Sequence, residues 1–308
     1  MRNAPYLRTS AVTALAPTIW GSTYLVTTNL LPPDRPVLDT AVRALPGGLL
    51  LLAAARQLPR GRWIWRSLVL GTLNIAVFNY LLFVAAYHLP GGIAGVIMAV
   101  QPMIVLVLGA LFLGERIRAV HLLACLLGAG GVALLVLKGA VGLNAVGVLA
   151  GLAAAASMAG GITLTKRWGR PEGVGVLAAT GWQLVAGGLV ILPFAVGVEG
   201  LPSGLSWRNL AGFGYLITMG ATISYAIWFR GLSRLTALTM SFLTLGSPIV
   251  ANVLGLVFQH ERLSALQVAG IAAILGSVFL AAPRAPAKRP PEPGPAAVPA
   301  GRRESAGT

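Results

Sequence analysis

The chain has 308 residues, of which 56% are hydrophobic and 10% are charged, and its formal net charge is +15. Because a soluble domain carries about 25% charged residues, this composition excludes an ordinary soluble globule and indicates a protein embedded in a lipid bilayer. The single cysteine, Cys125, excludes an intramolecular disulfide.

Ten apolar segments follow one another along the chain, and each is close to the length of about 20 residues that a membrane-spanning helix needs. We therefore predict an all-α integral membrane protein. Its ten expected transmembrane helices are 11–29, 37–55, 67–87, 92–113, 120–138, 145–165, 175–198, 209–229, 236–258 and 265–282. Residues 1–10 form the N-terminal segment. The basic, proline-rich tail 283–308 is expected to be disordered because it has little apolar surface to bury.

The distribution of Lys and Arg predicts how the chain enters the membrane. Of 23 such residues, 18 lie in the N-terminus, the tail and the loops on their side, four lie in the opposite loops, and Arg43 lies within a span. Cytoplasmic segments are enriched in Lys and Arg, so both termini are predicted to be cytoplasmic in a multi-pass protein of a bacterial inner membrane. No nucleic-acid-binding motif accompanies the positive charge, and we expect no nucleic-acid partner.

The chain also repeats itself. Residues 101–116 align without a gap with residues 247–262, including the prolines Pro102 and Pro248. Five spans per unit is an odd number, so a first unit at 11–140 and a second at 141–282 are predicted to cross the membrane in opposite directions. Carriers often build a substrate site from interrupted helices of such inverted repeats.

Polar and aromatic side chains gather in the spans around these prolines. Proline inside a helix removes a hydrogen bond from the carbonyl four residues earlier, here that of Met98 or Thr244. One proline is most simply a packing kink, whereas two at equivalent positions favour a substrate site. The predicted substrate pathway comprises Trp20, Tyr24, Asn74, Asn79, Gln101, Pro102, Ser224, Tyr225, Trp228, Ser247, Pro248 and Asn252. Interhelical hydrogen bonding or interfacial anchoring is the alternative for each.

Charged residues in or beside the spans are expected to have structural or topogenic roles. Asp39 and Arg43 are four residues apart, and we predict that they form an ion pair on one helix face. A glutamate precedes the fifth and the tenth span, where a carboxylate favours the helix dipole. These residues are Asp39, Arg43, Glu115, Arg116, Glu261 and Arg262. Since no acidic residue lies deep in a predicted span, no dedicated proton site is expected.

Motifs for catalysis are missing from the sequence. The three histidines have no metal-ligand spacing, and there is no phosphate-binding loop, nucleophile elbow or paired catalytic aspartate. We therefore expect no cofactor, no metal and no enzymatic activity.

Several motifs together resemble a known family. They are Trp20-Gly21, Arg43, the two prolines, both Glu-Arg pairs and Trp182-Gln183-Leu-Val-Ala-Gly-Gly188. Over about residues 11–282 the chain resembles the ten-span EamA-type carriers of the drug/metabolite transporter superfamily, and residues 19–36 resemble its PecM-like branch of pigment and metabolite exporters. The resemblance implies an inner-membrane exporter with a central cavity between spans 1, 3, 4, 6, 8 and 9. The first span lacks the glutamate of the small multidrug-resistance relatives, so their proton antiport is not implied.

The sequence thus predicts a secondary transporter that exports amino acids, other small metabolites, or a pigment- or drug-like compound by alternating access. A passive channel and an integral-membrane enzyme are the alternatives. The expected partners are a small-molecule substrate and the lipid bilayer. Small-residue motifs such as Gly147-x-x-x-Gly151 permit close helix packing, which leaves a homodimer open.

Overall fold

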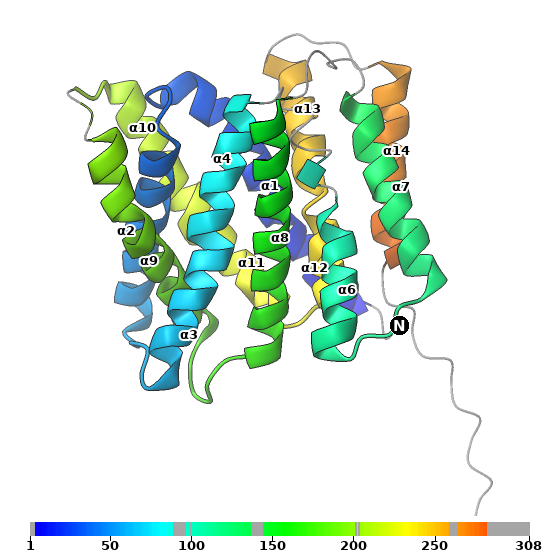
Figure 1. Cartoon of the computed structure of the whole chain (residues 1–308), viewed down its shortest axis with the longest axis horizontal. Helices are drawn as coiled ribbons and strands as arrows, with labels where there is room; N and C mark the ends of the chain where they lie inside the picture. Colours follow the sequence, from blue (N-terminus) through cyan, green and yellow to red (C-terminus); the bar gives the residue numbers. More distant parts are fainter. Residues whose placement is uncertain are drawn as a thin grey trace, which may run out of the picture.

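A computed structural model describes residues 4–88, 97–98, 100–136, 144–200, 202, 204–258 and 264–281. Every regular element among these residues is a helix, and the helices stand side by side in one bundle (Figure 1). The all-α class predicted from the sequence is confirmed, and most described residues of the predicted spans are helical, although a turn at Thr244 and Leu245 interrupts the span 236–258.

The first helix of the first half begins at Ala4, earlier than the predicted span 11–29. The helices of this half are α1 (Ala4–Leu30), α2 (Pro36–Ala55), a long helix made of α3 (Arg62–Gly71), the π-helical η1 (Thr72–Val77) and α4 (Phe78–His88), then α6 (Gln101–Leu113) and α7 (Ala119–Val136). Pro36 occupies the first turn of α2, where its missing N–H has no intrahelical partner to lose. Gly114 ends α6 in a left-handed conformation with φ of +68°.

The second half follows the same order. It contains α8 (Ala145–Trp168), α9 (Val176–Phe194) extended by the π-helical η3 (Ala195–Glu199), a long helix made of α10 (Trp207–Tyr215), η4 (Leu216–Ile223, π-helical) and α11 (Ser224–Leu232), then α12 (Ala237–Leu243), α13 (Gly246–Phe258) and α14 (Ala265–Ala281). Side-chain caps fix several starts. Asn144 accepts hydrogen bonds from the N–H groups of the first turn of α8, and Ser206 and Asn209 form a capping box at α10.

Five continuous helices of the described residues are long and apolar enough to cross a membrane: Pro36–Ala55, Arg62–Ala85, Ala145–Trp168, Val176–Glu199 and Trp207–Leu232. Shorter apolar helices lie at Gln101–Leu113, Ala119–Leu134 and Val268–Ala281. Large apolar side chains such as Leu111, Leu149 and Phe279 are exposed on the surface of the bundle. Such a surface fits contact with lipid better than contact with water.

The two halves of the chain are packed into each other. Helix α2 lies against α9, α7 against α14, α4 and α6 against α8, and α1 against α11 and α13. Glycines permit the closest approaches, since a Cβ added to Gly187 of α9 would lie 2.6 Å from the carbonyl oxygen of Gly71 in α3. The core is therefore formed between the halves rather than within each of them.

Both repeated prolines lie in the first turn of a helix, not in the middle of one. Pro102 is the second residue of α6, and Pro248 is the third residue of α13. The chain between α12 and α13 makes a tight turn, in which the N–H of Ser247 donates to the carbonyl of Thr244 at 3.0 Å. The sequence predicted an interruption at this place, and the carbonyl of Thr244, which loses its helical partner to Pro248, accepts a hydrogen bond within the turn instead.

The loops alternate between the two ends of the bundle. Loops 56–61, 114–118, 169–175 and 233–236 lie at the lower end in Figure 1, where the chain begins. At the other end, the Arg35 guanidinium donates to the carbonyls of Glu199 and Gly200 at 3.1 and 2.9 Å, which ties the start of α2 to the end of η3.

Candidate functional site

A backbone carbonyl inside η4 is the centre of the most polar buried region. In this π-helical segment the N–H of Ser224 bonds to the carbonyls of Met219 and Ala221, and thus skips the carbonyl of Gly220. Side chains take that carbonyl instead. The Arg43 guanidinium donates to it through Nε at 3.1 Å and Nη2 at 2.8 Å, and Trp20 Nε1 donates at 3.2 Å. π-Helical segments are frequent at functional sites because they free backbone groups in this way.

Aromatic rings surround this carbonyl. The Trp20 ring lies 5.1 Å, centroid to centroid, from both Tyr225 and Trp228, and its Nε1 also donates to Ser224 Oγ at 2.9 Å. The Arg43 guanidinium lies over the Tyr225 ring at 5.7 Å, which adds a cation–π contact. Tyr225 and Trp228 are each only 1% exposed, so the region is closed.

Asn79 joins the charged side chain to the aromatic ones. Its Oδ1 accepts from Arg43 Nη1 at 3.4 Å, and its Nδ2 donates to the Tyr225 hydroxyl at 3.1 Å. We name the whole group the charged cluster, and it consists of Trp20, Arg43, Asn79, Gly220, Ser224, Tyr225 and Trp228.

A second, neutral group is built on the other internal π-helical segment, η1. Asn74 Nδ2 donates to Gln183 Oε1 of α9 at 2.9 Å and to Thr165 Oγ1 of α8 at 3.2 Å. The Asn74 Oδ1 atom is buried and has no hydrogen-bond partner. We name Asn74, Thr165 and Gln183 the amide cluster.

The two clusters have corresponding places in their helices. Arg43 is the eighth residue of α2 and Gln183 is the eighth residue of α9. Arg43 reaches the π-helical segment of the second half, and Gln183 reaches that of the first half. The two contacts differ in chemistry, because one is made by a cation and the other by a neutral amide.

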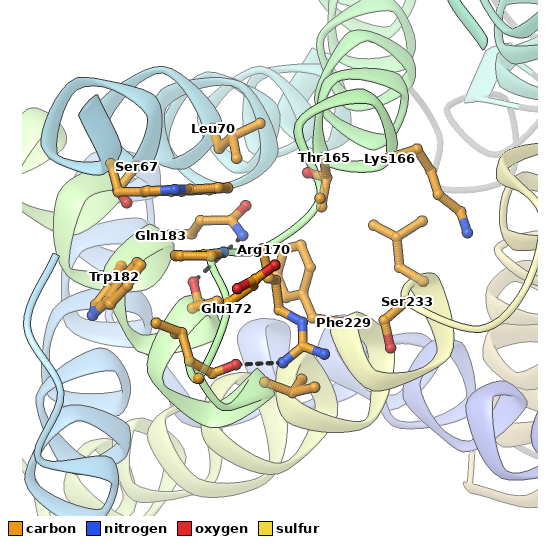
Figure 2. Close-up of a pocket in the computed structure, with 18 residues that line it drawn as sticks. Ser67, Leu70, Thr165, Lys166, Arg170, Glu172, Trp182, Gln183, Phe229 and Ser233 are labelled. Carbon is orange, nitrogen blue, oxygen red and sulfur yellow. Dashed lines mark hydrogen bonds between the residues drawn. The ribbon is translucent and has the colours of Figure 1, made fainter. Parts of the chain in front are cut away.

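A cavity of about 440 Å³ opens beside the amide cluster, at the end of the bundle that carries loop 169–175. Figure 2 shows Gln183 and Thr165 among the side chains around it, together with the aromatic Trp182 and Phe229. Its charged lining residues are Lys166, Arg170 and Glu172, and the Arg170 guanidinium donates to the carbonyl of Val174 at 2.7 Å. A volume of this size accommodates a small organic molecule.

The structure brings only part of the predicted pathway together. Five of the predicted residues form the charged cluster with Arg43 and Gly220, while Asn74 belongs to the amide cluster. Gln101 is buried on α6, and its Nε2 has no hydrogen-bond partner. Ser247 lies in the turn before Pro248. The side chains of Tyr24, Pro248 and Asn252, and all of Glu261 and Arg262, lie outside the described residues.

One predicted role of the charged residues needs correction. Both carboxylate oxygens of Asp39 lack a hydrogen bond, so Asp39 and Arg43 form no hydrogen-bonded ion pair, because the guanidinium turns to the Gly220 carbonyl. Asp39 is fully buried in the first turn of α2, near one end of the predicted span 37–55. Glu115 lies in the loop that directly precedes α7. Arg116 is exposed in the same loop.

The predicted pathway did not include Gln183, Thr165 or the loop 169–175. Arg43 and Gln183 occupy corresponding places in α2 and α9, and this equivalence is a signal that could have added Gln183. The cavity itself has no comparable signal, because its lining comes from four helices and a loop that are far apart in sequence.

Burial raises the pKa of Glu115 above its ordinary value of 4.5, while Lys166 and the Ala237 N–H act in the opposite direction. The folded protein therefore holds this proton more tightly than the unfolded chain does, and the resulting stability is lost as pH rises from about 4.5 through the raised pKa. Relative to Glu115→Gln, the wild type should be most stable in acidic buffer and lose that advantage toward neutral pH. Thermal unfolding of both proteins in a series of buffers measures this difference, and a difference that is constant with pH would contradict it.

Neighbouring glycines of α8 offer a matched test of the amide cluster. A Cβ on Gly161 would overlap Asn74 Oδ1, whereas a Cβ on Gly160 meets nothing within 4 Å. Gly161→Ala should displace Asn74 from Gln183 and reduce transport several-fold, while Gly160→Ala should leave it unchanged. Transport by both variants, at equal amounts of protein in the membrane, checks this. Equal activities would argue against a role for the amide cluster.

Comparison with known proteins connects this architecture to a family. The EamA-like transporter family matches the chain twice, over residues 9–137 and 145–282. Protein PecM of Dickeya dadantii (strain 3937) is 43% identical over 265 residues, which cover 86% of this chain and 89% of that protein. The uncharacterized inner membrane transporter YedA of Escherichia coli (strain K12) is 29% identical over 270 residues, which cover 85% of this chain and 86% of that protein.

A solved crystal structure of a protein 21% identical to this chain has a TM-score of 0.75, over 89% of this chain and 96% of that one. At this identity the likeness concerns the fold alone. The apolar helices and the transporter relatives agree on a multi-pass membrane protein, and the resemblance noted in the sequence is confirmed. With both halves matched by the same family, the chain belongs to the EamA-like transporter family.

Proposed function

We propose that this protein is a secondary transporter that exports a small organic metabolite across a bacterial inner membrane by alternating access. The observation that carries the proposal is the unequal state of the two clusters. The amide cluster borders an open cavity of about 440 Å³, whereas the charged cluster is buried and closed. A carrier that is open to one side and shut to the other has this arrangement.

The proposed architecture is ten spans in two inverted units, 11–140 and 141–282. The packing supports it, because contacts occur in corresponding pairs. Helix α4 packs on α8 as α11 packs on α1, α6 packs on α8 as α13 packs on α1, and η1 packs on α9 as η4 packs on α2. Exchanging the two halves therefore preserves the pattern of neighbours, as an inverted repeat requires.

We place both termini and the open cavity on the cytoplasmic side, since the cavity lies at the end where the chain begins and where most Lys and Arg loops lie. A periplasm-active reporter fused after residue 282 should be inactive, whereas the same reporter inserted in the loop that begins at residue 89 should be active. The reverse pattern would contradict the orientation.

The function is tested in two steps. Released metabolites are first compared between cells with and without the gene, without assuming a substrate. The compound that differs is then supplied to purified protein in proteoliposomes. A carrier predicts flux that saturates with substrate concentration and shows counterflow. Flux that rises linearly without counterflow would support a channel, and no difference in released metabolites would overturn export.

A further inference from the structure

Asp39 is a buried acid that belongs to neither the charged cluster nor the amide cluster. It is 0% exposed, and neither carboxylate oxygen has a hydrogen-bond partner. An ionised carboxylate in such a place is costly, because burying a charge without a partner forfeits its hydration. A carboxylic acid that carries its proton avoids this cost.

The ordinary role of an acid at this position is already filled. Asp39 lies in the first turn of α2, where a carboxylate usually bonds the free N–H groups of the helix start. Here the Glu199 carboxylate reaches across from η3 and accepts from the N–H groups of Val37 and Leu38 at 2.9 and 2.8 Å. The start of α2 therefore already has one carboxylate on its N–H groups, and Asp39 is a second acid without that role.

Three charged residues are relevant to Asp39, namely Glu199, Arg35 and Arg43. Glu199 holds the N–H groups of Val37 and Leu38, and the Arg35 guanidinium donates to the carbonyls of Glu199 and Gly200, so neither bonds Asp39. Arg43 lies one helical turn further along α2, on the same face. In this structure Arg43 is bonded to the Gly220 carbonyl and Asn79, and not to Asp39.

We propose that Asp39 is a proton-binding site that couples transport to the proton gradient. With the proton bound, Asp39 is neutral and Arg43 stays on the Gly220 carbonyl, which keeps the charged cluster closed. When Asp39 releases its proton toward the cytoplasmic cavity, its carboxylate attracts the Arg43 guanidinium, the Gly220 carbonyl in η4 is freed, and the periplasmic side opens. Asp39 then takes up a proton from the periplasm, so that one proton moves inward for each substrate molecule that moves outward. The coupling rests on the proposed function, whereas the proton site itself does not.

The proton site is tested without any substrate. Purified protein in lipid vesicles is titrated and followed by infrared spectroscopy at the carbonyl stretch of a protonated carboxyl group. We expect this band at neutral pH in the wild type and in Asp34→Asn, which changes an exposed acid at the same end, and its loss in Asp39→Asn. A band of equal strength in Asp39→Asn would overturn the proposal. Thermal unfolding confirms that both variants are folded.

The coupling is tested with the compound found by the metabolite comparison. For one proton exchanged per molecule, a difference of one pH unit sustains about a tenfold concentration ratio. Wild type and Asp34→Asn should build this ratio in proteoliposomes. Asp39→Asn should build none, yet should retain counterflow. Accumulation by Asp39→Asn equal to that of the wild type would overturn the coupling. Absence of counterflow in the wild type would instead overturn the proposed function and leave the infrared result standing.

Discussion

Replacing Arg43 with glutamine is expected to abolish measurable transport. The variant loses two hydrogen bonds from a cation to the Gly220 carbonyl, at 3.1 and 2.8 Å. Hydrogen bonds to charged groups contribute about 1.5–3 kcal/mol each. A loss of about 3 kcal/mol corresponds to roughly a 100-fold weaker hold on η4. Glutamine is a fair replacement because Gln183 occupies the corresponding place in α9.

Two further variants separate charge from shape. Arg43→Lys keeps the charge but cannot donate through a planar fork, so it should recover little of the activity. Arg118→Gln removes an exposed arginine of the loop before α7 and should behave like the wild type. The measurement is the initial rate of counterflow at equal amounts of protein. A normal rate for Arg43→Gln would remove the charged cluster from the mechanism.

Gly131→Ala should cause the largest loss of stability among single glycine changes on α7. A Cβ there would lie 2.8 Å from the carbonyl oxygen of Gly270 and 2.9 Å from the backbone nitrogen of Ile274, both in α14. Backbone atoms cannot rotate away, so the two helices must separate, and overpacking of this kind costs about 1–3 kcal/mol.

The adjacent glycine is the matched control. A Cβ on Gly130 meets nothing within 4 Å, and alanine is the better helix former, so Gly130→Ala should be neutral or slightly stabilising. Thermal unfolding of both variants in the same detergent gives the comparison. If Gly131→Ala unfolds at the same temperature as Gly130→Ala, helices α7 and α14 are not packed as described.

Much of the fold follows from the sequence because helix positions depend on local apolar runs. The predicted span 37–55 and helix α2 differ by one residue at one end, and the interruption before Pro248 was expected from the missing N–H of proline. Trp20, Ser224, Tyr225 and Trp228 were expected in one site because polar and aromatic side chains in lipid need partners.

The remainder depends on contacts that no local rule describes. Spacing along a helix predicted an Asp39–Arg43 pair, but a carbonyl from the other half of the chain competes for the guanidinium. The π-helical segments have no signature in composition, so the side-chain hydrogen bonds to the Gly220 carbonyl were not expected.

The difference between Arg43 and Gln183 makes the two halves energetically unequal. A transporter whose halves held each other with identical contacts would rest equally in its two orientations. Here Arg43 makes its contact as a cation on a carbonyl, whereas Gln183 makes its contact as a neutral amide. We therefore expect the resting population to be biased toward the orientation that keeps the Arg43 contact. Most copies of the protein in a membrane would then rest in the same conformation, with the same side open to the compartment from which they bind substrate.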